Sequence, residues 1–205
     1  AIDHDYLMVA DANLGNKSNR SILRQLTYDV TINSDQTVNG RLAVAYDYAD
    51  VIARDDPAID PAFHGPIDYS NLMQVFVPQG ATLTTHDNLG AEPRTVNTDA
   101  HTIFVSRVRV EYDTSQRYQL NYTMDGIIDT VGPYNRYRLL IQKQPGILSE
   151  TVTVQVSLPT GTTLINVEPT PDAIFNIEDV ILVFRIDLNV DTWLEIVFEP
   201  PDDID

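Results

Sequence analysis

The chain has 205 residues, of which 43% are hydrophobic, and its 30 acidic residues against 13 basic ones give a formal charge of −17. Such a surface repels nucleic acid, which is a polyanion, and repels an anionic membrane face for the same reason. The absence of cysteine excludes disulfides and thiolate metal sites, and no apolar run approaches the roughly 18 residues of a membrane-spanning helix. We therefore expect a solvated acidic surface, no nucleic-acid partner and no membrane insertion within this chain.

Residues 1–21 form an N-terminal segment whose role the sequence leaves open. The apolar stretch 6–10 could be a strand added to a first sandwich, and equally the tail of a domain that lies upstream. The chain begins with Ala1 and not with Met, so we expect it to be a piece of a longer protein whose membrane anchor lies outside these residues.

From residue 22 onward, alternation of apolar and polar residues predicts an all-β fold. The alternating segments are rich in Val, Ile, Tyr, Thr and Phe and cover residues 26–32, 41–48, 102–112, 117–124, 152–158, 181–188 and 193–198. Two hairpins are expected. The first joins 26–32 to 41–48 through a turn that ends in Asn39-Gly40, and the second joins 183–188 to 192–198 through residues 189–191. Residues 52–66, with three prolines, are expected to form a long loop.

An internal repeat organises these strands. Residues 75–83 (VFVPQGATL) recur 81 positions later as residues 156–164 (VSLPTGTTL), and 108–122 parallels 184–197. Residues 41–50 likewise resemble 137–146, with an offset that is larger by about the length of the 52–66 loop. We therefore predict two tandem immunoglobulin-like β-sandwich modules at residues 22–130 and 131–205, the second smaller, with fusion into one β domain as the alternative.

Three stretches carry a resemblance to a known family. They are residues 11–19 (DANLGNKSN) followed by 22–30, residues 69–71 (YSN) followed by 74–80 (QVFVPQG), and residues 137–146 (YRLLIQKQPG). In this order they resemble the C-terminal region of domain-of-unknown-function family number 4012. The resemblance implies a bacterial protein with an N-terminal membrane anchor and an extracytoplasmic portion, and it implies no activity for any named residue.

Histidines offer no catalytic pattern in this sequence. None of them lies in a nucleophile-elbow or zinc-protease motif, and we expect exposed, mostly loop, histidines at His4, His64, His86 and His101. No glycine-rich nucleotide motif occurs either. We therefore assign no catalytic, cofactor-binding or metal-binding residue and expect no cofactor.

Carboxylates could still bind calcium. A pattern that partly imitates a calcium loop consists of Asp187, Asn189, Asp191 and Glu195. Thr192 stands where such a loop needs glycine and Phe198 where it needs glutamate, so a strand–turn–strand is the simpler interpretation. Two further candidate clusters are Asp3, Asp5, Asp11 and Asn13, and the loop residues Asp55, Asp56 and Asp60.

Aromatic residues could form a sugar-binding platform. Candidates at strand spacing are Tyr46, Tyr48, Tyr118, Tyr122 and Trp193. The interpretation that competes with a platform is that these side chains fill the core.

These observations favour a non-enzymatic module with a structural or interaction-mediating role at the cell surface. We expect it to belong to a membrane-anchored bacterial envelope protein and to have a protein or a cell-envelope glycan as its partner. Two alternatives stay open, a glycan-binding module and part of an enzyme that acts on cell-envelope polymer.

Overall fold

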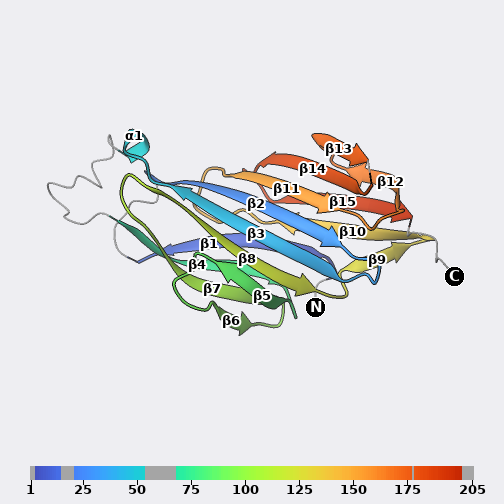
Figure 1. Cartoon of the computed structure of the whole chain (residues 1–205), viewed down its shortest axis with the longest axis horizontal. Coiled ribbons are helices and arrows are strands. Elements are labelled where there is room, and N and C mark those ends of the chain that lie inside the picture. The colour runs from blue at the N-terminus through green and yellow to red at the C-terminus, as the bar shows by residue number, and fades with distance from the viewer. Residues whose placement is uncertain (1–2, 15–20, 54–67, 177, 200–205) are drawn as a thin grey trace.

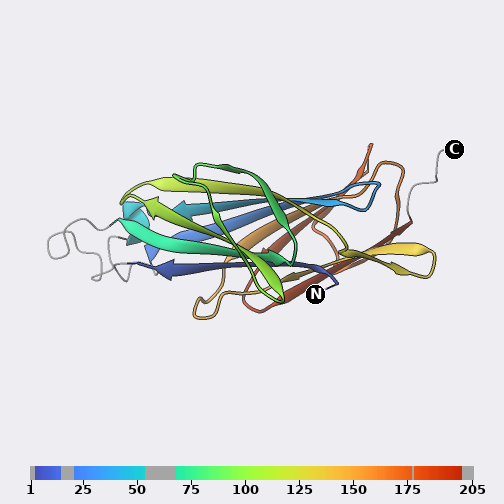
Figure 2. The ribbon, with the colours of Figure 1, turned by 90° about the horizontal axis from the view of Figure 1, so that it is seen from below.

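The structure is a computed structural model that describes residues 3–14, 21–53, 68–176 and 178–199. Its strands form two mixed sheets that pack face to face (Figures 1 and 2). The eight-stranded sheet has the order β12 (Thr163–Glu168), β15 (Thr192–Glu199), β10 (Tyr134–Ile141), β1 (Asp5–Asn13), β4 (Tyr69–Pro78), β7 (His101–Val110) and β6 (Arg94–Asn97), with β9 (Ile128–Val131) paired to β10. The seven-stranded sheet has the order β13 (Ala173–Asn176), β14 (Val180–Asp187), β11 (Thr151–Ser157), β2 (Leu23–Ile32), β3 (Val38–Asp47), β8 (Ser115–Met124) and β5 (Thr82–Asp87). The short helix α1 (Asp50–Ala53) follows β3.

The internal repeat is visible in the strand pairing. In the first copy β4 pairs with β7, β7 with β6, and β5 with β8. In the second copy β11 pairs with β14, β14 with β13, and β12 with β15 in the same pattern. The recurring Pro-x-Gly turns also match. Gly80 and Gly161 both have positive φ, and each turn leads from a strand of one sheet to a strand of the other, from β4 to β5 and from β11 to β12. The pairing of β3 with β8 and of β10 with β15 extends the correspondence upstream, as the sequence predicted.

The two copies occupy the sheets in opposite ways and share both of them. The strands β4, β6 and β7 lie in the eight-stranded sheet, whereas their counterparts β11, β13 and β14 lie in the seven-stranded one. Among the described strands, only two pairs are parallel. One joins the N-terminal strand β1 to β10 of the second copy, and the other joins β2 of the first copy to β11 of the second. Two separate immunoglobulin-like modules are therefore not confirmed; the strands of both copies form one sandwich with shared sheets.

The N-terminal segment contributes a central strand. β1 lies between β4 and β10 in the eight-stranded sheet, so the first of the two interpretations left open for residues 6–10 holds. Its inward side chains include Leu7 and Val9, both almost fully buried.

The first expected hairpin is confirmed and the second is wrong. β2 and β3 pair with each other, but the turn spans residues 33–37 and Asn39-Gly40 lies within β3. A glycine is needed at position 40 because a Cβ there would lie 2.7 Å from a ring carbon of Tyr122. β14 and β15, by contrast, lie in opposite sheets, so residues 189–191 carry the chain across the core. The prediction failed because each strand has one apolar face in either arrangement, so the sequence pattern is the same for a hairpin within one sheet and for an arch between two sheets.

The core lies between the sheets and is rich in tyrosine. The largest fully buried side chains include Tyr28, Tyr46, Tyr48, Tyr69, Tyr122 and Tyr137. Neighbouring rings lie in contact, for example Tyr46 and Tyr118 with centroids 5.9 Å apart. Because burial of aromatic surface is strongly stabilising, these rings hold the two sheets together along the molecule.

Candidate functional site

Two carboxylates of β1 point into the sandwich and are bound there by other side chains. Asp5 is fully buried, and its Oδ2 accepts hydrogen bonds from the hydroxyls of Tyr28 at 2.8 Å and Tyr137 at 2.5 Å. Burial raises the pKa of Asp5 to about 6, although its hydrogen bonds oppose this shift. The site is closed to solvent, so Asp5 serves the packing of the core.

Asp11 belongs to a second buried network. Its Oδ2 lies 2.9 Å from Nη1 of Arg24, and the Arg24 Nε lies 2.8 Å from Oε2 of Glu150. The three side chains are each less than one-tenth exposed. Tyr46 donates a hydrogen bond to Asp11 Oδ1 at 2.8 Å. One guanidinium thus neutralises carboxylates from β1 and from the segment before β11.

The candidate calcium residues do not converge. Asp3 is exposed and lies 3.0 Å from Arg138, whereas Asp5 and Asp11 are buried in separate networks. Asp55, Asp56 and Asp60 lie outside the described residues, as does the side chain of Asn13. In the parts of the chain that the structure describes, no three histidine, aspartate or glutamate side chains gather closely enough to hold a metal ion.

The residues of the calcium-like pattern lie on two strands and the connection between them, although this connection joins the two sheets and is not the expected hairpin. β14 ends at Asp187 and β15 begins at Thr192, and the Asn189 amide donates to the Asp187 carbonyl at 2.9 Å. Asp191 accepts a hydrogen bond from the Lys143 amide at 3.0 Å, while Glu195 lies on β15 near Arg136.

The histidines lie on strands or pack against rings. His86 is on β5 and not in a loop, 2.8 Å from Glu92, so that expectation was wrong. His101 begins β7 and stacks on Tyr6 with centroids 4.2 Å apart, and burial lowers its pKa. His4 lies against Trp193, with centroids 4.7 Å apart. His64 lies outside the described residues.

The tyrosines do not form the candidate aromatic platform, and the competing interpretation, that they fill the core, is confirmed. All four candidates are buried in the core, namely Tyr46, Tyr48, Tyr118 and Tyr122. Trp193 differs, because 48% of its surface is exposed. An exposed row made of these five residues is therefore ruled out, and Trp193 alone remains a surface aromatic.

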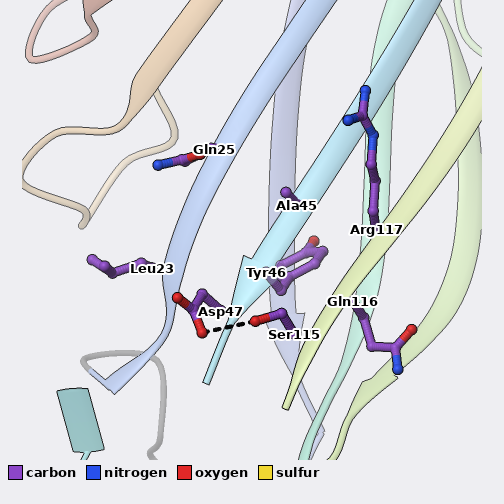
Figure 3. A pocket seen from close by; sticks show the side chains of 8 residues that line it. All are labelled: Leu23, Gln25, Ala45, Tyr46, Asp47, Ser115, Gln116 and Arg117. Atoms are coloured by element: carbon purple, nitrogen blue, oxygen red, sulfur yellow. Dashed lines mark hydrogen bonds between the residues drawn. The ribbon is translucent and has the colours of Figure 1, made fainter. Parts of the chain in front are cut away.

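A shallow hollow of about 320 Å³ lies on the outer face of the seven-stranded sheet (Figure 3). Its floor is Ala45, whose short side chain lies between those of Gln25 on β2 and Arg117 on β8. At its end, Asp47 accepts a hydrogen bond from Ser115 Oγ at 2.9 Å. The remaining lining residues are Leu23, Tyr46 and Gln116. The lining offers polar groups to a small ligand but no histidine to activate the serine.

A second candidate surface lies on the outer face of the eight-stranded sheet. We call it the aromatic strip and define it by Trp193, His4, Leu140, Tyr6, His101 and Phe76. Trp193 on β15 pairs in register with Leu140 on β10, and Leu140 pairs with Tyr6 on β1. Tyr6 and Phe76 both contact the His101 ring. Side chains from β15 to β7 thus form one row, in which Trp193 is the most accessible ring.

Charged side chains held in ion pairs lie along the same outer face as Trp193. Glu195 follows Trp193 at two residues on β15, and Arg138 is in register with Glu195 on β10. Farther along β10, Arg136 lies 2.6 Å from Asp129 and 3.8 Å from Glu195, and Arg138 lies 3.4 Å from Asp129. The Arg136 guanidinium holds the pKa of Asp129 below its usual value. By register, Glu195 and Arg138 are the charged side chains of this group that lie nearest to Trp193.

The two sheets differ sharply on their outer faces. The positions of β2, β3, β8 and β11 that face outward are mainly threonine, glutamine, asparagine and alanine, as at Thr27, Ala43, Gln119 and Thr153. These four strands have no counterpart to the aromatic strip, although edge strand β13 carries the exposed Phe175. The strip joins ring contacts across several strands, so it is the stronger candidate for a binding surface.

Comparisons with known proteins place the fold but give no family. No protein-family model matches the chain, and no curated protein matches it. A proposed nutrient-binding protein from Legionella pneumophila has a similar structure, with a TM-score of 0.57 at 10% identity, over 93% of this chain and 72% of that chain. This likeness shows a shared fold alone.

Two other structures are more distant. A zinc metallopeptidase from Deinococcus radiodurans gives a TM-score of 0.42 at 11% identity, over 88% of this chain and 42% of the peptidase. The folded domain of LppM from Mycobacterium tuberculosis gives a TM-score of 0.36 at 10% identity, over 88% of this chain and 92% of that domain.

The described part of the chain contains no helix long and apolar enough to cross a membrane.

Sequence reasoning missed most of the aromatic strip because its members come from five strands, most of them distant from one another in the chain. One signal was present. Residues 6–9 are apolar at consecutive positions, which is typical of a strand covered on both faces.

Proposed function

We propose that the chain is a non-enzymatic binding module of a bacterial envelope protein and that the aromatic strip is its binding surface. The observation that carries this proposal is the row of rings on an outer sheet face, ending in the half-exposed Trp193. An exposed aromatic beside polar side chains is typical of recognition surfaces.

The positions of the carboxylates support a role without catalysis. Asp5, Asp11 and Glu150 are enclosed between the sheets and bound by tyrosine or arginine side chains. Hydrolysis of a polymer needs carboxylates that reach the substrate. These three do not, and Asp129 and Glu195 on the outer face are engaged in ion pairs with Arg136. The extracytoplasmic location and the likeness to domain-of-unknown-function family number 4012 belong to the same proposal, and the acidic surface is compatible with both.

Co-sedimentation with isolated bacterial envelopes tests the proposal. We expect the wild-type chain to sediment with envelopes and Trp193→Asp to remain in the supernatant, because the substitution places a charge on the exposed end of the strip. The matched control is Phe175→Asp, which changes an aromatic of similar exposure (51%) on edge strand β13 of the other sheet. Equal sedimentation of wild type and Trp193→Asp would place the binding surface elsewhere, and no sedimentation of the wild type would refute the envelope-binding role.

A further inference from the structure

We propose that the ligand of the aromatic strip is a neutral glycan, an unbranched chain of hexopyranose units that stacks on Trp193. This inference rests on the proposed function and names the chemical class of its ligand.

The first support is the geometry of Trp193. Its ring belongs to β15 at a position that alternates with buried Leu194, so it lies on the outer face, and 48% of it is exposed. His4 lies against it at a centroid distance of 4.7 Å with the planes tilted by 57°, which restricts the indole from one side. A restrained, half-exposed indole offers a flat apolar area to the C–H face of a pyranose ring, and little conformational entropy is lost on binding.

The second support is the set of polar groups beside the indole. Glu195 follows Trp193 at two residues on the outer face of β15, and Arg138 lies opposite Glu195 on β10. Arg138 also lies 3.0 Å from Asp3, the residue before the His4 that contacts the indole. They combine acceptors and donors within a small area, as a ligand with many hydroxyl groups requires. A sugar presents this mixture of an apolar face and a polar edge, which an apolar ligand does not.

The third support is the charge at the surface. The chain as a whole is strongly acidic, whereas on this face the two arginines Arg136 and Arg138 contact three carboxylates, Asp129, Glu195 and Asp3, so that all but one of these negative charges are compensated. A cationic ligand would find no concentrated negative charge at this place, and an anionic ligand would be repelled by the molecule as a whole. An uncharged ligand fits both conditions.

A protein partner fits this surface less well. Tyr6 is 5% exposed, and the apolar row away from Trp193 is largely covered by its own neighbours, including His101 and Gln142. Stable protein interfaces depend on larger clusters of accessible anchors. A single half-exposed indole is enough to stack one pyranose ring, so a glycan does not need the covered part of the row.

The test uses Trp193 as its own reporter, because the chain contains a single tryptophan. The intact chain is titrated with chitohexaose, with cellohexaose and with anionic hexagalacturonate, and tryptophan emission is recorded. We expect at least one neutral hexasaccharide to shift or quench the emission in a saturable way and hexagalacturonate to bind more weakly.

Variants are compared by calorimetry, which does not need the indole. Trp193→Ala should weaken binding of the neutral hexasaccharide about 10-fold or more, the loss expected for an aromatic contact worth roughly 1.4 kcal/mol. Glu195→Gln should weaken it less, and Phe175→Ala, at the distant edge strand, should bind within about twofold of wild type. Thermal unfolding of each variant shows whether it is folded, and Trp193→Phe provides a second variant that keeps a ring.

The outcomes separate the two proposals. If the chain binds envelopes through Trp193 but neither neutral hexasaccharide, the glycan proposal is refuted while the binding surface stands. Binding of a hexasaccharide that is unchanged in Trp193→Ala would also refute the site. If neither envelopes nor sugars bind, the proposed function itself fails.

Discussion

Asp5 is a carboxyl group in a place where its charge is costly. It is fully buried, and its three hydrogen bonds, from the hydroxyls of Tyr28 and Tyr137 and from the Tyr6 amide, do not offset the loss of water. Burial therefore raises its pKa from 3.8 to about 6. Between these values the folded state binds more protons at Asp5 than the unfolded state, so its contribution to stability falls as pH rises.

The replacement Asp5→Asn isolates this effect. The variant loses hydrogen bonds at every pH, but it has no ionisation at this position. Relative to wild type, its free energy of unfolding should therefore rise between about pH 4 and about pH 7, by up to roughly 3 kcal/mol for a shift of about two pKa units. Urea denaturation across this range measures the difference, and the other acids cancel because both proteins share them. A difference that is independent of pH would show that Asp5 stays ionised throughout.

At the scale of elements, Arg24 holds three segments together. Its guanidinium contacts Asp11 of β1 and Glu150 before β11, and its Nη2 donates to the Val9 carbonyl at 3.1 Å. Removal of the cation leaves two buried carboxylates without the positive charge that neutralises them. We expect Arg24→Leu to lower the free energy of unfolding by about 3–5 kcal/mol, measured with urea at neutral pH.

Arg41 on the neighbouring strand provides the matched control. It pairs with Asp29 at 2.5 Å, but its side chain is 57% exposed. Exposed pairs contribute little, so Arg41→Leu should cost less than about 1 kcal/mol. Similar losses for the two variants would mean that the Arg24 network is not the buried junction described above.

The same elements explain which features could be predicted from the sequence. Alternation identified β2, β3, β7, β8, β11, β14 and β15, because each buries one face. The repeat was readable because both copies need the same Pro-x-Gly turn. Pairing was not readable, because a hairpin and an arch between sheets share one pattern of alternation, as β14 and β15 illustrate. The candidate site depended on that pairing, so only Trp193 of the aromatic strip was anticipated.

At the scale of the molecule, each sheet contains strands from both sides of the module boundary predicted between residues 130 and 131. β10 pairs with β1 and β11 pairs with β2, and these two parallel ladders connect the copies (Figure 1). A cut at this boundary would leave β10 and β11 each with an open edge and would expose apolar side chains such as Leu139 and Val154, both 0% exposed. A fragment of this size has little core of its own to compensate.

We therefore expect the whole chain to unfold in one cooperative transition and residues 131–205 alone to lack fixed structure. Calorimetry of the chain should give a single peak, and the amide spectrum of the fragment should show narrow dispersion. Mixing with residues 1–130 should restore dispersion, because the two parallel ladders can then form again. A fragment that is well dispersed alone and has its own unfolding transition would show instead that each copy is an independent module, and the shared sheets would then be a docking arrangement of two domains.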